Sequence, residues 1–350
     1  MSVNSAAGES EFPARKAASS KLRSFLLLCV LCLLGGAARA GELPISYLID
    51  LREPATHLVR VTMTIPQTPA ATQIQFAAWN NLYQIRDFVR NVQELRAECD
   101  GSNQELKRED LETWRSGDSP CGQLTLRYRV YAHEESAFSS ILSESHAFLN
   151  FAMLCFYLPQ QRDRKIRVKF LLPPDWRVAT LLDAGDPPSD FVAPNFDALA
   201  DSPAEAGKFQ DFSYTQKGAT YRVIVHSEEA AVPTDRLLGS LAKITATATD
   251  LMQDVPFSQY TFIFHFVSEG SMGGMEHCNG TAINYAARDL EHNWSSLEDV
   301  AAHEFFHLWN VKRIRPQHLE PIDYVHGNDT RDLWFSEGLT STPKMGTWPA

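Results

Sequence analysis

Three features are absent or scarce in this sequence, and each absence excludes a class of protein. Acidic residues (43 Asp and Glu) outnumber basic ones (32 Lys and Arg), and the basic residues form no stripe, so a nucleic-acid partner is not expected. The longest apolar run, Phe25–Leu34, is too short to span a bilayer. No internal repeat is present. The sequence is therefore typical of an acidic globular protein.

The first 40 residues have the order of features found in a secretory signal peptide. Lys21 and Arg23 form the positive flank, Phe25–Leu34 the apolar core, and Ala38-Arg39-Ala40 the cleavage site. We therefore expect an exported mature chain, periplasmic or secreted, without a stable membrane anchor. Three N-x-S/T sequons begin at Asn279, Asn293 and Asn328, around the substrate cleft that the motifs below predict. Glycans at these positions would obstruct substrate, which favours a host that does not use such sites and hence a bacterial periplasm.

Four cysteines remain after the predicted signal peptide, and four thiols allow three pairings. They are Cys99, Cys121, Cys155 and Cys278. Cys99 and Cys121 flank a polar segment and are the favoured pair. Cys278 follows Glu276 and His277, which belong to a segment expected to bind the substrate. At this position we expect a thiol without a role in metal binding, and the alternative is a metal ligand.

Length and pattern predict an α+β protein with two domains after residue 40. Residues 41–228 are expected to form a β-rich, sandwich-like domain, because apolar and polar residues alternate along several segments. The alternating apolar residues are Val59, Val61, Met63, Ile65, Leu124, Leu126, Tyr128 and Val130. Residues 229–350 begin with a helical pattern that ends before Pro256. Its apolar face comprises Leu237, Leu238, Leu241, Ile244, Ala248, Leu251 and Met252.

The run from His303 to His307 (HEFFH) has the spacing of a catalytic zinc site. Residues four apart share one face of a helix, so both imidazoles can bind one metal ion with Glu304 beside it. A catalytic zinc keeps one position open for water and lowers its pKa to about 7. Glu304 can take that proton and pass it to a leaving amine. The motif predicts peptide hydrolysis with one Zn²⁺ per chain; the alternative is an ordinary amphipathic helix.

The flanking residues place this motif on a helix. Ser295 and Ser296 precede Glu298 and Asp299 by three residues, which predicts a capping box at the start of the helix. Pro316 prevents the helix from continuing.

A third protein ligand is needed, and Glu337 is the candidate. It lies thirty positions after His307, within the sequence WFSEG. A carboxylate from a second helix would complete a His₂Glu set. The alternative is a surface glutamate at the start of a helix.

A second group of residues precedes the metal motif. Tyr260–Val267 is rich in β-branched and aromatic residues and predicts a strand. Gly273, Gly274 and Met275 follow, and such glycines allow another chain to approach closely. We expect this edge to bind an extended peptide substrate as an added strand. Glu276 could then pair with the substrate's free α-ammonium group, which would make the enzyme an aminopeptidase; the alternative is an exposed loop glutamate.

Several of these strings resemble the glycyl aminopeptidase-like zinc peptidases, which usually carry a C-terminal PDZ domain. The matching strings are GGMEH (273–277), HEFFHLWNVKRIRP (303–316) and LWFSEGLTS (333–341). Upstream, ISYLIDL near Ile45, IRDFVRNV near Ile85 and LADSP (199–203) are also similar. The resemblance implies a gluzincin, in which an N-terminal β-rich domain precedes a thermolysin-like catalytic domain.

The resemblance also implies a role for individual residues. His303, His307 and Glu337 would bind zinc, and Glu304 would be the general base. GGMEH is similar to the GAMEN element of membrane alanyl aminopeptidases, whose glutamate holds the substrate's amino terminus; the corresponding residue is Glu276. Members of the family favour N-terminal glycine and alanine.

The sequence departs from the family pattern after Gly338. Pro343 would break a helix about six residues after Glu337, and the chain stops at Ala350. In related gluzincins a tyrosine beyond the third ligand stabilises the oxyanion, and we expect its counterpart past residue 350. The hypothesis is that this is a truncated product with an incomplete catalytic domain.

Three functions follow from the sequence. The first is an exported zinc aminopeptidase acting on N-terminal Gly or Ala. The second is a thermolysin-type endopeptidase in which Glu276 is incidental. The third is a non-catalytic binding protein that keeps the fold.

Overall fold

The computed structural model describes residues 43–79, 85–186, 190–227, 231–268 and 272–341. The predicted signal peptide, residues 1–40, and the segment 342–350 lie outside these described residues. None of the described helices is both long enough and apolar enough to cross a membrane.

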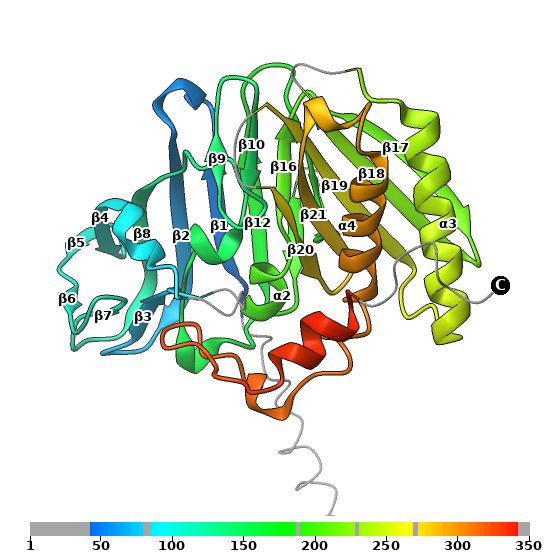
Figure 1. The fold of residues 1–350 in the computed structure, drawn as a ribbon. Coiled ribbons are helices and arrows are strands. Elements are labelled where there is room, and N and C mark those ends of the chain that lie inside the picture. Colours follow the sequence, from blue (N-terminus) through cyan, green and yellow to red (C-terminus); the bar gives the residue numbers. More distant parts are fainter. Residues whose placement is uncertain (1–42, 80–84, 187–189, 228–230, 269–271, 342–350) are drawn as a thin grey trace, which may run out of the picture. The chain divides into compact units, whose positions relative to one another are not determined.

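The N-terminal part is built around an eight-stranded sheet (Figure 1). Only β1 and β12 pair in parallel within it; the other neighbours are antiparallel. In spatial order its strands are β14 (Asp183–Ala184), β15 (Asp190–Ala193), β12 (Ile166–Leu171), β1 (Ile45–Asp50), β2 (Leu58–Thr68), β8 (Cys121–Tyr131), β4 (Val92–Cys99) and β5 (Ser102–Gln104). The predicted β-rich N-terminal domain is confirmed.

Two four-stranded sheets complete this part. The first has the order β13 (Arg177–Thr180), β16 (Ala204–Gly207), β10 (His146–Leu149) and β9 (Ile141–Leu142). The second has the order β11 (Phe156–Tyr157), β3 (Gln73–Phe76), β7 (Thr113–Arg115) and β6 (Lys107–Arg108). Short helices connect the strands: η1 (Pro54–Thr56), η2 (Phe88–Asn91), η3 (Phe151–Met153), η4 (Pro159–Gln161) and α2 (Phe196–Ala200).

The alternation read from the sequence places the core of this part. In β2 every second residue from Val59 to Ile65 is buried while its neighbours are partly exposed. In β8 the predicted residues from Leu124 to Val130 are also buried. Successive side chains of a strand point to opposite faces, so one face of each strand supplies the core.

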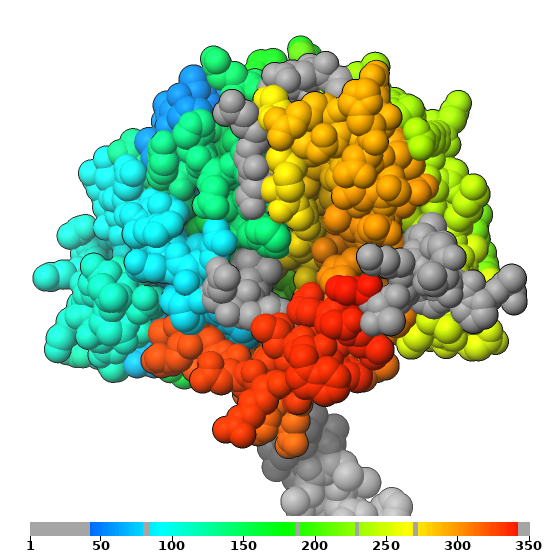
Figure 2. All heavy atoms as spheres, in the orientation of Figure 1, coloured from blue at the N-terminus to red at the C-terminus, as the bar shows by residue number. Residues whose placement is uncertain are grey.

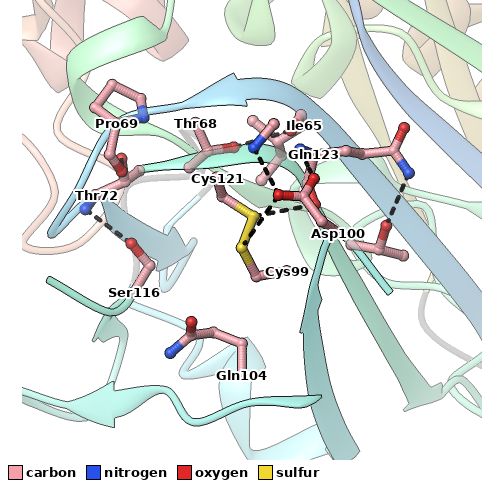
Figure 3. The surroundings of a disulfide bond; sticks show 12 residues. Ile65, Thr68, Pro69, Thr72, Cys99, Asp100, Gln104, Ser116, Cys121 and Gln123 are labelled. Carbon is pink, nitrogen blue, oxygen red and sulfur yellow. Dashed lines mark hydrogen bonds between the residues drawn. A yellow bond between two sulfur atoms is a disulfide. The ribbon is translucent and has the colours of Figure 1, made fainter. Parts of the chain in front are cut away.

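A disulfide joins Cys99, at the end of β4, to Cys121, at the start of β8 (Figure 3). Their Cα atoms are 5.7 Å apart. The carboxylate of Asp100 accepts hydrogen bonds from the backbone N–H groups of Gly122 (3.1 Å) and Gln123 (2.8 Å), which fixes the same two strand ends together. The favoured pairing is confirmed.

The C-terminal part is built on a five-stranded sheet. In spatial order its strands are β17 (Gln210–Gln216), β18 (Ala219–Ser227), β19 (Gln259–Val267), β21 (Gly280–Ala286) and β20 (Gly273–His277). The three central strands are parallel, and β20 is an antiparallel edge strand. The domain boundary expected near residue 229 therefore falls inside this sheet, because β18 ends at Ser227 and pairs directly with β19.

Two helices, α3 (Thr234–Met252) and α4 (Trp294–Phe306), lie side by side on one face of this sheet (Figure 1). Four of the seven residues predicted for the apolar face of α3 are buried: Leu237, Leu241, Ile244 and Ala248. The prediction for Leu251 is wrong, since this second-to-last residue of the helix is exposed. The remaining short helices are η5 (Ala287–Asp289), η6 (Gln317–Leu319) and η7 (Trp334–Leu339).

The capping box predicted at the start of α4 is wrong. Asn293 is the N-cap residue and its side chain makes no capping hydrogen bond, so Ser295 and Ser296 lie inside the first turn. The carboxylate of Glu298 accepts hydrogen bonds from the hydroxyl of Ser240 of α3 and from the indole of Trp294, which are side-chain donors and not the backbone N–H of a capping box. A tertiary contact between the helices has replaced the local one.

A buried cluster of charged residues joins the two parts of the chain. Glu205 of β16 faces His146 of β10 at 3.1 Å and His265 of β19 at 2.9 Å. Asn284 of β21 accepts from the other ring nitrogen of His265 at 2.9 Å and donates to Glu135 at 3.3 Å. Burial alone lowers the pKa of His146, but Glu205 and Glu135 outweigh it and raise that pKa to about 10. His146 is therefore held as a cation that pairs with Glu205.

This cluster predicts a loss of stability at high pH. The pKa of His146 is about 10 in the folded chain and 6.5 as its ordinary value, so its stabilisation is complete below pH 6.5 and disappears as the pH rises toward 10. We expect the free energy of unfolding to fall between pH 6 and 9.5 by an amount on the order of a few kcal/mol. Denaturant titrations at the two pH values measure it. In His146→Gln the fall should be smaller by this amount, because His307 and Glu304 also have raised pKa values in this range; a fall equal to that of the wild type would contradict this assignment.

Candidate active site

The helix α4 brings the two histidines of the HExxH motif together. The Nε2 atoms of His303 and His307 are 3.0 Å apart. The Nδ1 atom of His307 lies 2.7 Å from the carbonyl oxygen of Asn310, which accepts its proton. The Nδ1 atom of His303 lies 3.3 Å from the hydroxyl of Ser341, which itself donates to the carbonyl of Glu337. Both Nδ1 atoms thus have acceptors, which leaves both Nε2 lone pairs directed at one point.

The structure brings the predicted third residue to the same point. Glu337 lies on η7, and its Oε2 atom is 3.3 Å from His303 Nε2 and 3.6 Å from His307 Nε2. Ligands held at about 2.0–2.2 Å around a tetrahedral ion are about 3.3–3.6 Å apart from one another. The two distances from the carboxylate to the imidazoles match this spacing, and the 3.0 Å between the imidazole nitrogens is somewhat shorter. Two imidazoles with one carboxylate are a donor set suited to a divalent transition metal.

Asn310 holds the two metal-facing segments together, and sequence reasoning gave it no role. It is buried three residues after His307. Its side-chain NH₂ group donates to the carbonyl oxygens of Phe335 (3.1 Å) and Ser336 (3.2 Å) and lies 3.0 Å from the hydroxyl of Thr340. One residue thus orients His307 through its backbone and fixes η7 through its side chain. Its only sequence signal is a single amide within an apolar run, LWNV.

The carboxylate of Glu304 lies against the strand β20, within 4.8 Å of a ring nitrogen of His307. A Cβ atom placed on Gly274 would overlap the Cγ and Cδ atoms of Glu304, so the position needs glycine for the carboxylate to lie there. The Oε2 atom of Glu304 is buried and has no hydrogen-bond partner among the described residues. Burial, with lesser contributions from Glu276 and Glu337, raises the pKa of Glu304 to about 8. The group is thus a buried carboxyl whose proton affinity is strongly increased.

Glu276 lies on the edge strand β20, where its side chain is buried near the metal-facing residues. Carboxylate atoms of Glu276 and Glu304 and a ring nitrogen of His307 lie within 4.8 Å of one another. The preceding Gly273 has a φ of +140°, a conformation that favours glycine. Met275 points to the opposite face of the sheet and is buried in a separate apolar cluster, so its side chain is not brought to the site.

A pocket of about 290 Å³ opens beside these groups. It is lined by Gly273, Gly274, Asp299, Val300, His303, Glu304, Thr340 and Ser341. One wall is the glycine part of the edge strand and the opposite wall is α4. Figure 2 shows the C-terminal residues (red) lying against the surface formed by the segment around α4 (orange). The pocket is therefore bounded by all three predicted groups: the metal helix, the edge strand and the segment that carries Glu337.

The site has more carboxylates than cationic groups, which favours the binding of a cation. Burial would raise the pKa of Glu337, but its hydrogen bonds to His303 and His307 lower it to about 2, so it is ionised. Burial would lower the pKa of His307, but the carboxylates of Glu276, Glu337 and Glu304 raise it to about 9. Three carboxylates around one imidazole make a site where a proton or a metal cation is strongly favoured.

The sequence matches two family descriptions. Residues 46–208 match the Peptidase M61 N-terminal domain, and residues 296–344 match the M61 glycyl aminopeptidase. The chain belongs to the M61 peptidase family. The second match contains His303, Glu304, His307 and Glu337, whereas Glu276 lies between the two matched regions. The predicted family is confirmed, and M61 proteins are generally metallopeptidases.

The chain is also similar to two solved structures. The chain is 31% identical to an aminopeptidase N family protein from Idiomarina loihiensis, with a TM-score of 0.80 over 85% of this chain and 53% of that one. The chain thus spans about half the length of this solved relative. Aminopeptidase A from Legionella pneumophila, solved with aspartic acid, is 14% identical, with a TM-score of 0.48 over 78% of this chain and 35% of that one. No curated protein sequence matches the chain.

Proposed function

We propose that this M61 peptidase is a zinc-dependent aminopeptidase that removes small N-terminal residues from peptides. The observation that carries the proposal is the convergence of His303 Nε2, His307 Nε2 and Glu337 Oε2 within 3.6 Å of one another, with the unpartnered Oε2 of Glu304 beside them. Two imidazoles and one carboxylate are the ligand set of zinc hydrolases that keep a position open. When bound, zinc supplies Lewis-acid chemistry and lowers the pKa of water to about 7.

The chain's own residues perform the proton transfers in this proposal. Glu304 accepts the proton of the attacking water at its carboxylate, which lies against Gly274 in the pocket wall. It then donates that proton to the leaving amine, so the same group acts as base and acid. Its raised pKa, about 8 without a bound cation, favours holding the proton between the two steps. A cation bound beside Glu304 lowers the pKa of this carboxyl toward 7.

The edge strand β20 orients the substrate. Among the described strands β21 alone pairs with it, on one side, so the N–H and C=O groups of its other side can pair with an extended peptide. Glu276 of the same strand pairs with the substrate's α-ammonium group, and its carboxylate lies within 4.8 Å of a ring nitrogen of the metal-facing His307. The preference for glycine or alanine rests on the family resemblance and agrees with the modest size of the pocket.

Replacing Glu276 tests whether the enzyme requires a free N-terminus. Loss of one partner of a buried, hydrogen-bonded charge pair costs about 2–5 kcal/mol, so Glu276→Gln should lower kcat/KM for peptides with a free Gly or Ala terminus by about 30-fold or more. Cleavage rates of free and N-acetylated peptides are compared for both enzymes. The endopeptidase alternative predicts equal cleavage of the two peptides by the wild type and no selective loss in the variant.

Export remains part of this proposal. The disulfide between Cys99 and Cys121 supports it, because such bonds persist in oxidising compartments and are rare in the cytosol. The signal-peptide features of residues 1–40 support it independently. N-terminal sequencing of the protein recovered from the periplasm tests it, with a new terminus just after Ala40 as the expected result.

A further inference from the structure

Three sequence motifs meet at one carboxylate that the proposed reaction does not use. Asp201, from the LADSP segment, lies at the C-terminal end of α2. Its carboxylate accepts hydrogen bonds from His277 Nδ1 (3.1 Å), from the backbone N–H of Cys278 (2.9 Å) and from Lys312 Nζ (2.8 Å). His277 ends the GGMEH strand, and Lys312 belongs to the HEFFHLWNVKRIRP run. Asp201 therefore links three segments that are far apart in the sequence.

The link is strongly charged and mostly buried, with the Asp201 side chain 22% exposed. The side chain of Lys312 is only 6% exposed. Burial lowers its pKa, but the nearby carboxylates of Asp201 and Glu276 outweigh this effect and raise it above its ordinary value. Burial acts to raise the pKa of Asp201, yet Lys312 and His277 bring it far below its usual range. Both groups are therefore ionised, and the pair is a fixed contact rather than a mobile surface one.

The position of this link matters because it lies at the end of β20 that carries Glu276. Among the described strands, β20 pairs with β21 alone, so it is an edge strand. Its first two residues are glycines, which restrict the backbone least. Glu276 directly precedes His277, and Lys312 follows the metal-facing His307 by five residues. The Asp201 carboxylate thus fixes the strand that carries the ammonium-binding glutamate to the segment that continues from the metal helix.

We propose that Asp201 is a positioning residue that sets the distance between Glu276 and the metal, and so determines how strongly the site selects a substrate with a free amine. The inference rests on the proposed aminopeptidase function. Without the bridge, β20 loses two hydrogen bonds at the end nearest Glu276, and the carboxylate of Glu276 can move relative to the metal. Metal binding itself involves other atoms and is expected to persist.

The test uses two small metal-binding ligands that differ only in the amine. Dissociation constants of alanine hydroxamate and of propionohydroxamate, which lacks the amino group, are measured on the zinc-loaded protein. The Kd of propionohydroxamate divided by the Kd of alanine hydroxamate gives the preference for the free amine, and this ratio reports the ammonium site independently of turnover. We expect Asp201→Asn to reduce this ratio at least 10-fold while the constant for propionohydroxamate changes less than about 2-fold. In the Glu276→Gln background the same substitution should not change the ratio further, since coupled residues are non-additive.

Two further variants keep the test decisive if Asp201→Asn is poorly folded. Asp201→Glu keeps the charge but displaces the carboxylate, and Asp201→Asn combined with Lys312→Met removes the buried pair as a whole. Each should reduce the ratio with the zinc content unchanged. A preserved ratio in folded variants, or an equal weakening of both ligands, would overturn the positioning role. If Glu276→Gln itself leaves the ratio unchanged, the aminopeptidase proposal fails instead.

Discussion

Glu304→Gln should abolish peptide turnover while leaving metal binding intact. Glutamine fills the same space against Gly274 but cannot accept a proton, so both proton transfers lose their carrier. General acid–base groups contribute about 10²–10⁴-fold to a rate, and we expect a loss in kcat of at least that size. Steady-state hydrolysis of an Ala-terminated peptide, with zinc content measured on the same sample, gives both quantities.

The matched control for this substitution is Glu291→Gln, an exposed glutamate between β21 and α4. It loses the same charge outside the pocket and should retain the wild-type rate. Two results would contradict the role of Glu304. The variant could keep more than a tenth of the wild-type kcat, or its rate could fall in proportion to its zinc content, which would make the residue a contributor to metal binding only.

Removal of the metal should eliminate activity and lower thermal stability together. The carboxylates of Glu276, Glu304 and Glu337 surround His307, and without a cation their mutual repulsion is compensated only by protons. A ligand that binds only the folded state stabilises it by about 4 kcal/mol at a thousand times its dissociation constant. We therefore expect a chelator to abolish turnover and lower the Tm by several degrees, and stoichiometric zinc to restore both.

The control for chelation is the variant His303→Ala combined with His307→Ala. Its Tm should be independent of zinc, because the removed Nε2 atoms are the ones that converge in the wild type. An identical response of the variant and the wild type to zinc would place the stabilising ion elsewhere. Retention of full activity after exhaustive chelation would exclude a metal-dependent reaction.

Local geometry explains which features of the site could be predicted from the sequence. His303 and His307 are four residues apart on a helix, and helical geometry alone brings them to one face. The strand β19 and the alternating faces of β2 and β8 depend on periodicities of the same local kind. These predictions are confirmed because the pattern that signals each element also determines it.

Long-range contacts explain what the sequence did not reveal. Glu337 could be named as a candidate, but its position depends on Asn310, whose amide reaches η7 across more than twenty residues. The capping box was wrong because Glu298 bonds to the side chains of Ser240 on α3 and Trp294 and not to a backbone N–H at its own helix end. Met275 could not be separated from Glu276 before the pairing of β20 was known, since that pairing sets which face each side chain takes.

The most direct test of the account is an anomalous diffraction map recorded at the zinc edge from crystals of the zinc-loaded protein. The account predicts one strong peak per chain at about 2.0–2.2 Å from His303 Nε2, His307 Nε2 and a carboxylate oxygen of Glu337, with Glu304 outside the coordination sphere. A peak located elsewhere, or a peak that excludes Glu337, would contradict it.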